Sequence, residues 1–64
     1  RRILEEVRRL EEPYREVFLL HVLGGVKLKE IAAAQGKTEE WARVTYYRAK
    51  CRIAGKIGGR GDGR

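Results

Sequence analysis

The 64-residue chain has one cysteine, one histidine, one proline and no methionine. The single cysteine, Cys51, has no partner for an internal disulfide, which argues against a small secreted scaffold stapled by disulfides. A zinc site of several cysteines is excluded for the same reason, and the single His21 has no second imidazole beside it. No apolar run approaches the roughly 20 residues of a membrane span. The sequence therefore predicts a protein without metal, cofactor or membrane contact.

Groups that carry out catalysis are also lacking. No nucleophile stands beside a base, and the acidic residues are predicted to lie on solvated helix faces without a partner histidine. A chain this short buries only about 60% of its unfolded surface, which leaves no deep cleft between domains. We therefore expect that it is not an enzyme. Because it starts without methionine and ends in Gly63-Arg64, we also expect it to be a piece of a longer protein.

Positive charge is concentrated in the second half of the chain. Residues 1–36 contain 7 basic and 6 acidic residues, a balance of +1, whereas residues 37–64 contain 8 basic and 3 acidic residues, a balance of +5. Between Trp41 and Lys56 there are five basic residues and no acidic one. A basic stretch that also contains aromatic residues indicates a polyanionic partner, with nucleic acid first among the candidates.

Apolar residues at helical spacing predict an all-α domain of four helices over residues 2–11, 13–23, 28–35 and 39–56. Pro13 suits the first turn of the second helix, where its missing N–H costs nothing. Gly24-Gly25 and Gly36 predict the ends of the second and third helices. The domain is predicted to cover residues 1–57, and the glycine-rich residues 58–64 are predicted to form a flexible tail.

The segment from Leu28 to Lys50, LKEIAAAQGKTEEWARVTYYRAK, has the pattern of a helix-turn-helix. Ala32 provides the small residue that a close helix crossing needs, and Gly36, four residues later, provides the turn. Thr38 is a favoured N-cap, and the acidic residues that follow it suit the start of a helix. A short α-hairpin that does not bind DNA could have the same spacing, so this pattern alone leaves that alternative open.

The last predicted helix has a distinct outward face. If Ala42, Tyr46, Ala49 and Ile53 form its inward apolar stripe, the outward residues are Arg43, Tyr47, Arg48, Lys50 and part of Val44. Arginine can bond to guanine in the major groove, and arginine or lysine can neutralise phosphates. The ring of Tyr47 could contact a thymine methyl or a sugar, or its hydroxyl could donate to a phosphate. The outward face therefore predicts binding to double-stranded DNA.

The motifs PYREVFLL, LKEIAAAQGKT and WARVTYYRAK, in this order, closely resemble region 4 of bacterial RNA polymerase sigma factors, in particular the extracytoplasmic-function subgroup. The resemblance covers about Leu10 to Ile53. It implies that the last helix recognises the promoter −35 element during transcription initiation, through contacts that fall on Arg43, Val44, Tyr47 and Arg48. Neighbouring phosphate contacts would fall on Lys37, Thr38 and Lys50.

The resemblance also implies protein partners. Region 4 binds the flap of the polymerase β subunit, mainly through its other helices, and membership implies an anti-sigma factor as a candidate inhibitor and the bacterial cytoplasm as the location. Region 2 is absent from the sequence, so we do not expect this chain to initiate transcription alone. Gln35 and Lys37 stand where the motif often has apolar residues, and Val44-Thr45 replace a frequent Ser-Arg pair, which leaves the exact −35 sequence open.

Two alternatives remain at this stage. The second predicted helix is apolar on more than one side, at Leu19-Leu20 and Val22-Leu23, so the chain could act mainly by binding the polymerase flap or an anti-sigma factor. It could also be the helix-turn-helix output domain of another transcriptional regulator. Among the remaining residues, we expect Trp41 to pack against the third helix and Cys51 to be an inert thiol on a helix flank.

Overall fold

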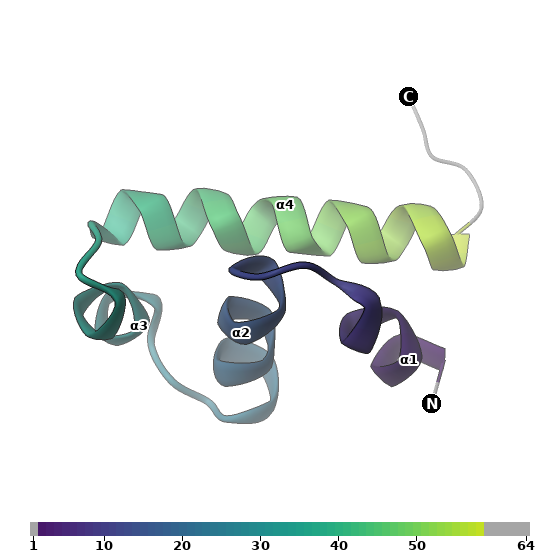
Figure 1. The fold of residues 1–64 in the computed structure, drawn as a ribbon, viewed down its shortest axis with the longest axis horizontal. Helices are drawn as coiled ribbons and strands as arrows, with labels where there is room; N and C mark the ends of the chain where they lie inside the picture. The colour runs from purple at the N-terminus through teal and green to yellow at the C-terminus, as the bar shows by residue number, and fades with distance from the viewer. Residues whose placement is uncertain (1, 59–64) are drawn as a thin grey trace.

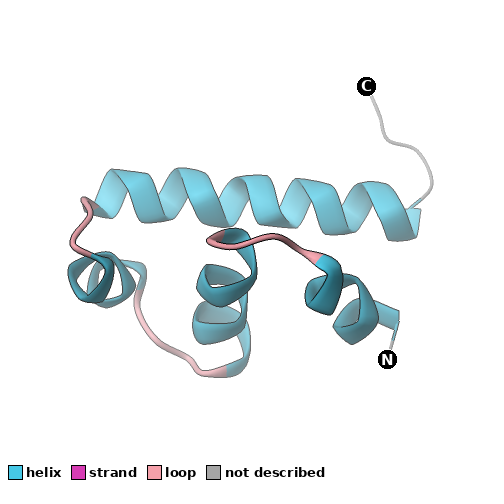
Figure 2. Cartoon of the chain, viewed as in Figure 1, coloured by secondary structure: helices cyan, strands magenta, loops and turns pink. Residues whose placement is uncertain are grey.

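The computed structural model describes the backbone of residues 2–58 and the side chains of residues 4–55. Its elements are α1 (Arg2–Arg9), α2 (Tyr14–Phe18), the π-helical turn η1 (Leu19–Leu23), α3 (Leu28–Gln35) and α4 (Glu39–Gly58). Short loops join these helices, and no strand occurs in the described part of the chain (Figure 2). The predicted all-α class with a C-terminal helix-turn-helix is confirmed. None of the helices in residues 2–58 has both the length and the apolarity required to cross a bilayer.

The longest helix, α4, lies along one side of the domain, and the shorter helices all pack beneath it (Figure 1). Along α4, α3 lies near its N-terminal end, α2 near its middle and α1 towards its C-terminal end. The side of α4 that faces away from these helices is not covered by any other element within residues 2–58. This arrangement leaves one long face of α4 open to a partner.

A small apolar core holds α4 against the other helices. Val7, Phe18, Ala49 and Ile53 form one buried cluster, and Leu10, Tyr14, Leu19 and Tyr46 pack against it. At the other end of α4, Ile31 is 1% exposed, and Ala32 and Ala42 are also buried. Because alanine is small, the helix axes of α3 and α4 can approach closely at this crossing. The predicted position of Ala32 at the helix crossing is confirmed.

The inward face of α4 differs from the predicted stripe at two neighbouring residues. Tyr46 is only half-buried, whereas Thr45 is 5% exposed. Thr45 follows Ala42 by three residues and precedes Ala49 by four, so it lies on the same helix face as these two buried alanines. Because the threonine side chain has a polar hydroxyl, the predicted apolar stripe did not include this position.

The helix ends shift by about two residues from the predicted ones. α1 ends at Arg9 rather than residue 11, because the Leu10 N–H donates to Val7 O at 3.0 Å and closes a tighter turn. α4 continues past Lys56 to Gly58. Residues 59–64 of the predicted tail lie outside the described residues.

The second predicted helix changes its winding after Phe18. The Gly24 N–H donates to Leu19 O at 3.0 Å, a bond that spans five residues and defines η1 as π-helical rather than α-helical. The half-buried His21 ties the following loop to this turn, because His21 Nδ1 donates to Val26 O at 2.8 Å. A Cβ atom at Gly24 would lie 2.8 Å from Leu20 O, which is too close, so this sharp exit requires glycine.

Candidate nucleic-acid interface

The turn between α3 and α4 is closed by backbone hydrogen bonds around Gly36. Gly36 has φ 70° and ψ 29°, in the left-handed region that favours glycine. Its N–H donates to Ala33 O at 3.1 Å, and the Lys37 N–H donates to Ala32 O at 2.8 Å. These two bonds form a Schellman motif, which satisfies the last carbonyls of α3 and sets the direction in which the chain enters α4.

The start of α4 is capped by a side chain, as predicted. Thr38 Oγ1 accepts a hydrogen bond from the Trp41 N–H at 3.1 Å. Glu39 and Glu40 follow in the first turn, where negative charge is favourable at the positive end of the helix dipole. The Thr38 hydroxyl still has its own proton, so the cap leaves it able to donate to an external acceptor such as a phosphate.

All of the residues predicted to contact DNA are exposed. Val44 is 38% exposed and Tyr47 is 64% exposed, which is unusual for large apolar or aromatic side chains. The structure places five of the predicted residues on α4 and two at the turn before it: Arg43, Val44, Tyr47, Arg48 and Lys50, and Lys37 and Thr38. Together, these exposed positions at the turn and along α4 are the candidate interface.

Weak contacts orient several of the cations at this surface. Arg43 Nη1 lies 3.8 Å from Glu39 Oε2 across one helical turn. Lys50 Nζ lies 5.4 Å from the ring centroid of Tyr46, and Lys37 Nζ lies 5.8 Å from that of Trp41. Exposed contacts of these kinds contribute about 0.3–1 kcal/mol, so a phosphate could displace them at little cost.

Tyr47 differs from the other tyrosines because its ring is largely exposed. Tyr14 and Tyr46 are half-buried beneath the cations of Arg52 and Lys50. The neighbouring Cys51 raises the pKa of the Tyr47 phenol, mainly because the hydroxyl hydrogen-bonds with the thiol one turn away. Tyr47 therefore remains neutral well above physiological pH and presents an uncharged ring to a partner.

Comparison with known proteins identifies the family of this domain. A sequence model described as "Sigma-70, region 4", which is typical of the extracytoplasmic-function sigma factors, matches residues 1–53. The chain belongs to the sigma-70 region 4 family. No curated protein and no solved structure matches it. Region 4 is a non-enzymatic DNA-binding domain, and membership implies binding of −35 promoter DNA and of RNA polymerase in transcription initiation. The predicted family and the absence of enzymatic function are confirmed.

Two residues of this region 4 domain were not predicted to belong to the interface. Cys51 is exposed on α4, one turn after Tyr47 and two turns after Val44, so it continues the same face. Glu39 contacts Arg43, as the spacing of four residues between opposite charges allows. Helical spacing places both residues beside the predicted contacts. Neither residue is basic or aromatic, so a prediction based on basic and aromatic residues did not include them.

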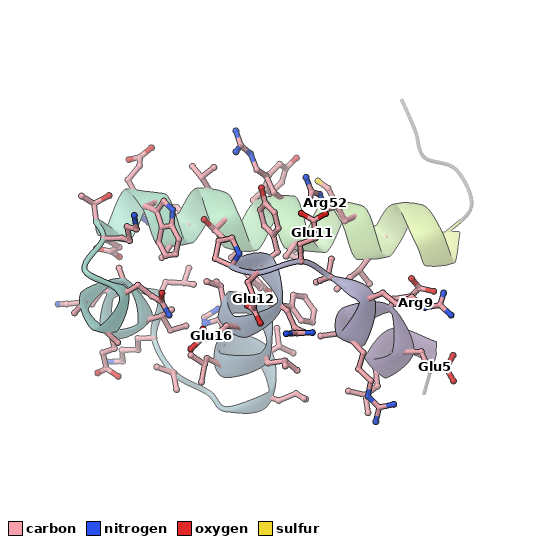
Figure 3. All side chains as sticks on the ribbon, viewed as in Figure 1. Glu5, Arg9, Glu11, Glu12, Glu16 and Arg52 are labelled. Atoms are coloured by element: carbon pink, nitrogen blue, oxygen red, sulfur yellow. The ribbon has the colours of Figure 1, made fainter. Side chains whose placement is uncertain are left out.

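The region 4 domain also has a hollow on its surface, away from the turn. A hollow of about 330 Å³ lies between the end of α1 and the C-terminal half of α4, lined by Glu6, Arg9, Leu10, Glu11, Arg52 and Ile53. Figure 3 shows Glu11 and Arg52 close to each other where the loop after α1 passes α4. Charges of both signs line this hollow, and the described residues contain no group of three metal-ligating side chains.

Proposed function

We propose that α4 enters the major groove of the −35 element as the recognition helix of a sigma factor. The observation that carries this proposal is the position of the candidate interface, because its residues are exposed on the side of α4 that the other helices leave open. An α-helix fits the major groove, where each base pair presents a distinct pattern of donors, acceptors and methyl groups. The positive charge of the second half of the chain favours the approach to DNA.

The proposed roles divide between bases and phosphates. Arg43, Val44, Tyr47 and Arg48 contact base edges, while the phosphates on either side are bound by Lys37, Thr38 and Lys50. Two or three good base contacts at about 1–3 kcal/mol each set the register but do not give tight binding alone. The isolated domain therefore binds weakly and with strong salt dependence, and attachment to the polymerase raises its effective concentration at the promoter.

Selection of binding sites from randomised duplexes tests this proposal. We expect the chain, mixed with the polymerase β flap, to enrich a defined sequence. Arg48→Ala should then weaken binding to the selected duplex more than binding to random DNA. Arg8→Ala on α1 is the matched control, because it removes the same charge from an exposed residue outside the candidate interface.

Three results would count against the proposal. Equal losses on selected and random DNA would reduce Arg48 to a phosphate contact. If Arg8→Ala weakened binding to the selected duplex as much as Arg48→Ala, net charge rather than the face of α4 would explain the affinity. Selection of no preferred sequence would contradict recognition by α4 altogether.

A second surface supports binding to the polymerase. Val22 and Leu23, at the end of η1, are 46% and 65% exposed, and both are large and apolar. We propose that they contact the β flap, with an anti-sigma factor as the other candidate partner. The double variant Val22→Ala/Leu23→Ala should lose flap binding and keep DNA selectivity, whereas Arg43→Ala/Arg48→Ala should show the opposite pattern.

The family match favours a sigma factor, working in the bacterial cytoplasm, over the output domain of another regulator. Such output domains often dimerise through a terminal helix, so sedimentation of this chain provides a separate check. A sedimentation coefficient that does not change with concentration supports the sigma-factor assignment. Self-association at micromolar concentration would favour the regulator.

A further inference from the structure

From Val44 onwards, the free face of α4 has an uncharged centre between two charged edges. One turn earlier, the exposed Glu40 lies in the same sector. Successive helix residues are about 100° apart, so Val44, Tyr47 and Cys51 fall within a sector of about 60°. By the same measure, Arg48 lies about 40° beyond one side of this sector, and Arg43 and Lys50 lie about 40–60° beyond the other. This apolar stripe, defined as Val44, Tyr47 and Cys51, therefore occupies the middle of the exposed face.

The contacts of the flanking cations support this division. Arg43 is held towards Glu39 at 3.8 Å, and Lys50 is held towards the ring of Tyr46 at 5.4 Å, so both point along the edge of the face. From these edges, Lys50 can reach a phosphate that borders the major groove, while the long side chains of Arg43 and Arg48 can reach base edges from either side. The side chains in the middle then meet the floor of the groove, where the base edges lie.

Within the apolar stripe, Tyr47 offers a large ring for apolar contact. Its ring is 64% exposed, and helical spacing places Cys51 one turn beyond it. Val44 has no polar group at all and is 38% exposed. In the major groove the apolar feature that distinguishes base pairs is the C5 methyl group of thymine.

We infer that the apolar stripe reads thymine methyl groups, so that Val44 and Tyr47 select thymines at neighbouring base pairs of the −35 element. Val44 and Tyr47 are about 4.5 Å apart along the helix axis, close to the roughly 3.4 Å between stacked base pairs. Cys51 extends the stripe by one turn. This inference rests on the proposed entry of α4 into the major groove and adds the chemical feature that it recognises.

The test replaces thymine by deoxyuridine, which lacks only the methyl group, at each thymine of the selected duplex in turn. We expect a three- to fivefold loss of affinity at one thymine for each contact, the size expected for one buried methyl group. Val44→Ala should abolish the effect at one of these positions, and Tyr47→Ala should abolish it at the other. Tyr47→Phe should keep it, because the ring rather than the hydroxyl makes the contact.

Leu4→Ala is the control variant, since it shortens an apolar side chain of α1 that is 44% exposed and lies outside the apolar stripe. It should leave every deoxyuridine effect unchanged. Sequence-selective binding that is unaffected by deoxyuridine at all thymines, or a selected site without thymine, would overturn the inference while leaving recognition by α4 intact. A failure of the proposed function is recognisable separately, because then no sequence is selected at all.

Discussion

The two sides of α4 differ in burial and, at the crossings with α2 and α3, in the size of their side chains. Towards the other helices, Ala42, Thr45 and Ala49 are small and at most 5% exposed, and towards solvent Tyr47 and Arg48 are large and exposed. Small residues on the inward side allow α2 and α3 to approach the helix, whereas no neighbour limits residue size on the outward side. The comparison separates residues that determine folding from residues that determine binding.

This separation matters because so small a domain has little stability to lose. A core of this size contributes no more than about 3–5 kcal/mol of net stability. A binding residue that also served the core could not change without risk to the fold. The following predictions test whether the two sides of α4 are independent.

The largest effect is expected from the inward side. Ile53→Ala removes a side chain that is 6% exposed and packs in the cluster with Val7 and Phe18, so it should lower the free energy of unfolding by about 2–5 kcal/mol. Urea titration followed by circular dichroism measures this loss. Val44→Ala on the outward side is the control and should change stability by less than about 0.5 kcal/mol. Similar losses for both variants would show that the two sides are not independent.

A smaller effect on stability is expected at Gly36, in the turn that sets the direction of α4. A side chain at Gly36 meets no atom within 4 Å, but the left-handed backbone there should make Gly36→Ala destabilising by about 1–2 kcal/mol. Gly55→Ala is the matched control, since that glycine also has open space around it but lies inside α4. It should stabilise the domain by about 0.5–1 kcal/mol. A loss at Gly55 equal to that at Gly36 would contradict the assigned backbone conformation.

The smallest effect is expected from the outward charges. Glu39→Gln removes the 3.8 Å contact with Arg43 and one negative charge from the first turn of α4, and should destabilise the domain by about 0.3–1 kcal/mol. Salt screens exposed charges, so the difference should shrink when urea titrations are repeated in 1 M salt. A difference that persists at high salt would point to packing instead of charge.

Features determined by a few adjacent residues could be predicted from the sequence. The end of α3 at Gly36 and the Thr38 cap follow from local chemistry, and both are confirmed. The exposure of Arg43, Tyr47 and Arg48 follows from helical period together with the burial of the opposite side. The roles of these residues in DNA contact stay predictions, as do the domain limits at residue 57 and the tail.

Features that depend on tertiary packing could not be predicted. The hydrogen bond from His21 Nδ1 to Val26 O holds the loop that follows η1 against this π-helical turn. No pattern of neighbouring residues in the sequence predicts a bond between this imidazole and the Val26 carbonyl. The burial of Thr45 depends on how closely α3 and α2 approach α4. The spacing of Thr45 fits the buried face, but its side chain is polar, so it was not part of the predicted apolar stripe.

The Schellman motif at Gly36 has a practical consequence for redesign. Because the path into α4 is set by main-chain bonds between Lys37, Gly36 and the end of α3, it does not depend on which outward side chains the helix carries. A library that randomises only Val44, Tyr47 and their exposed neighbours would therefore present every member at the same angle. Such a scaffold lends itself to retargeting towards new operators by simple exchange of surface residues.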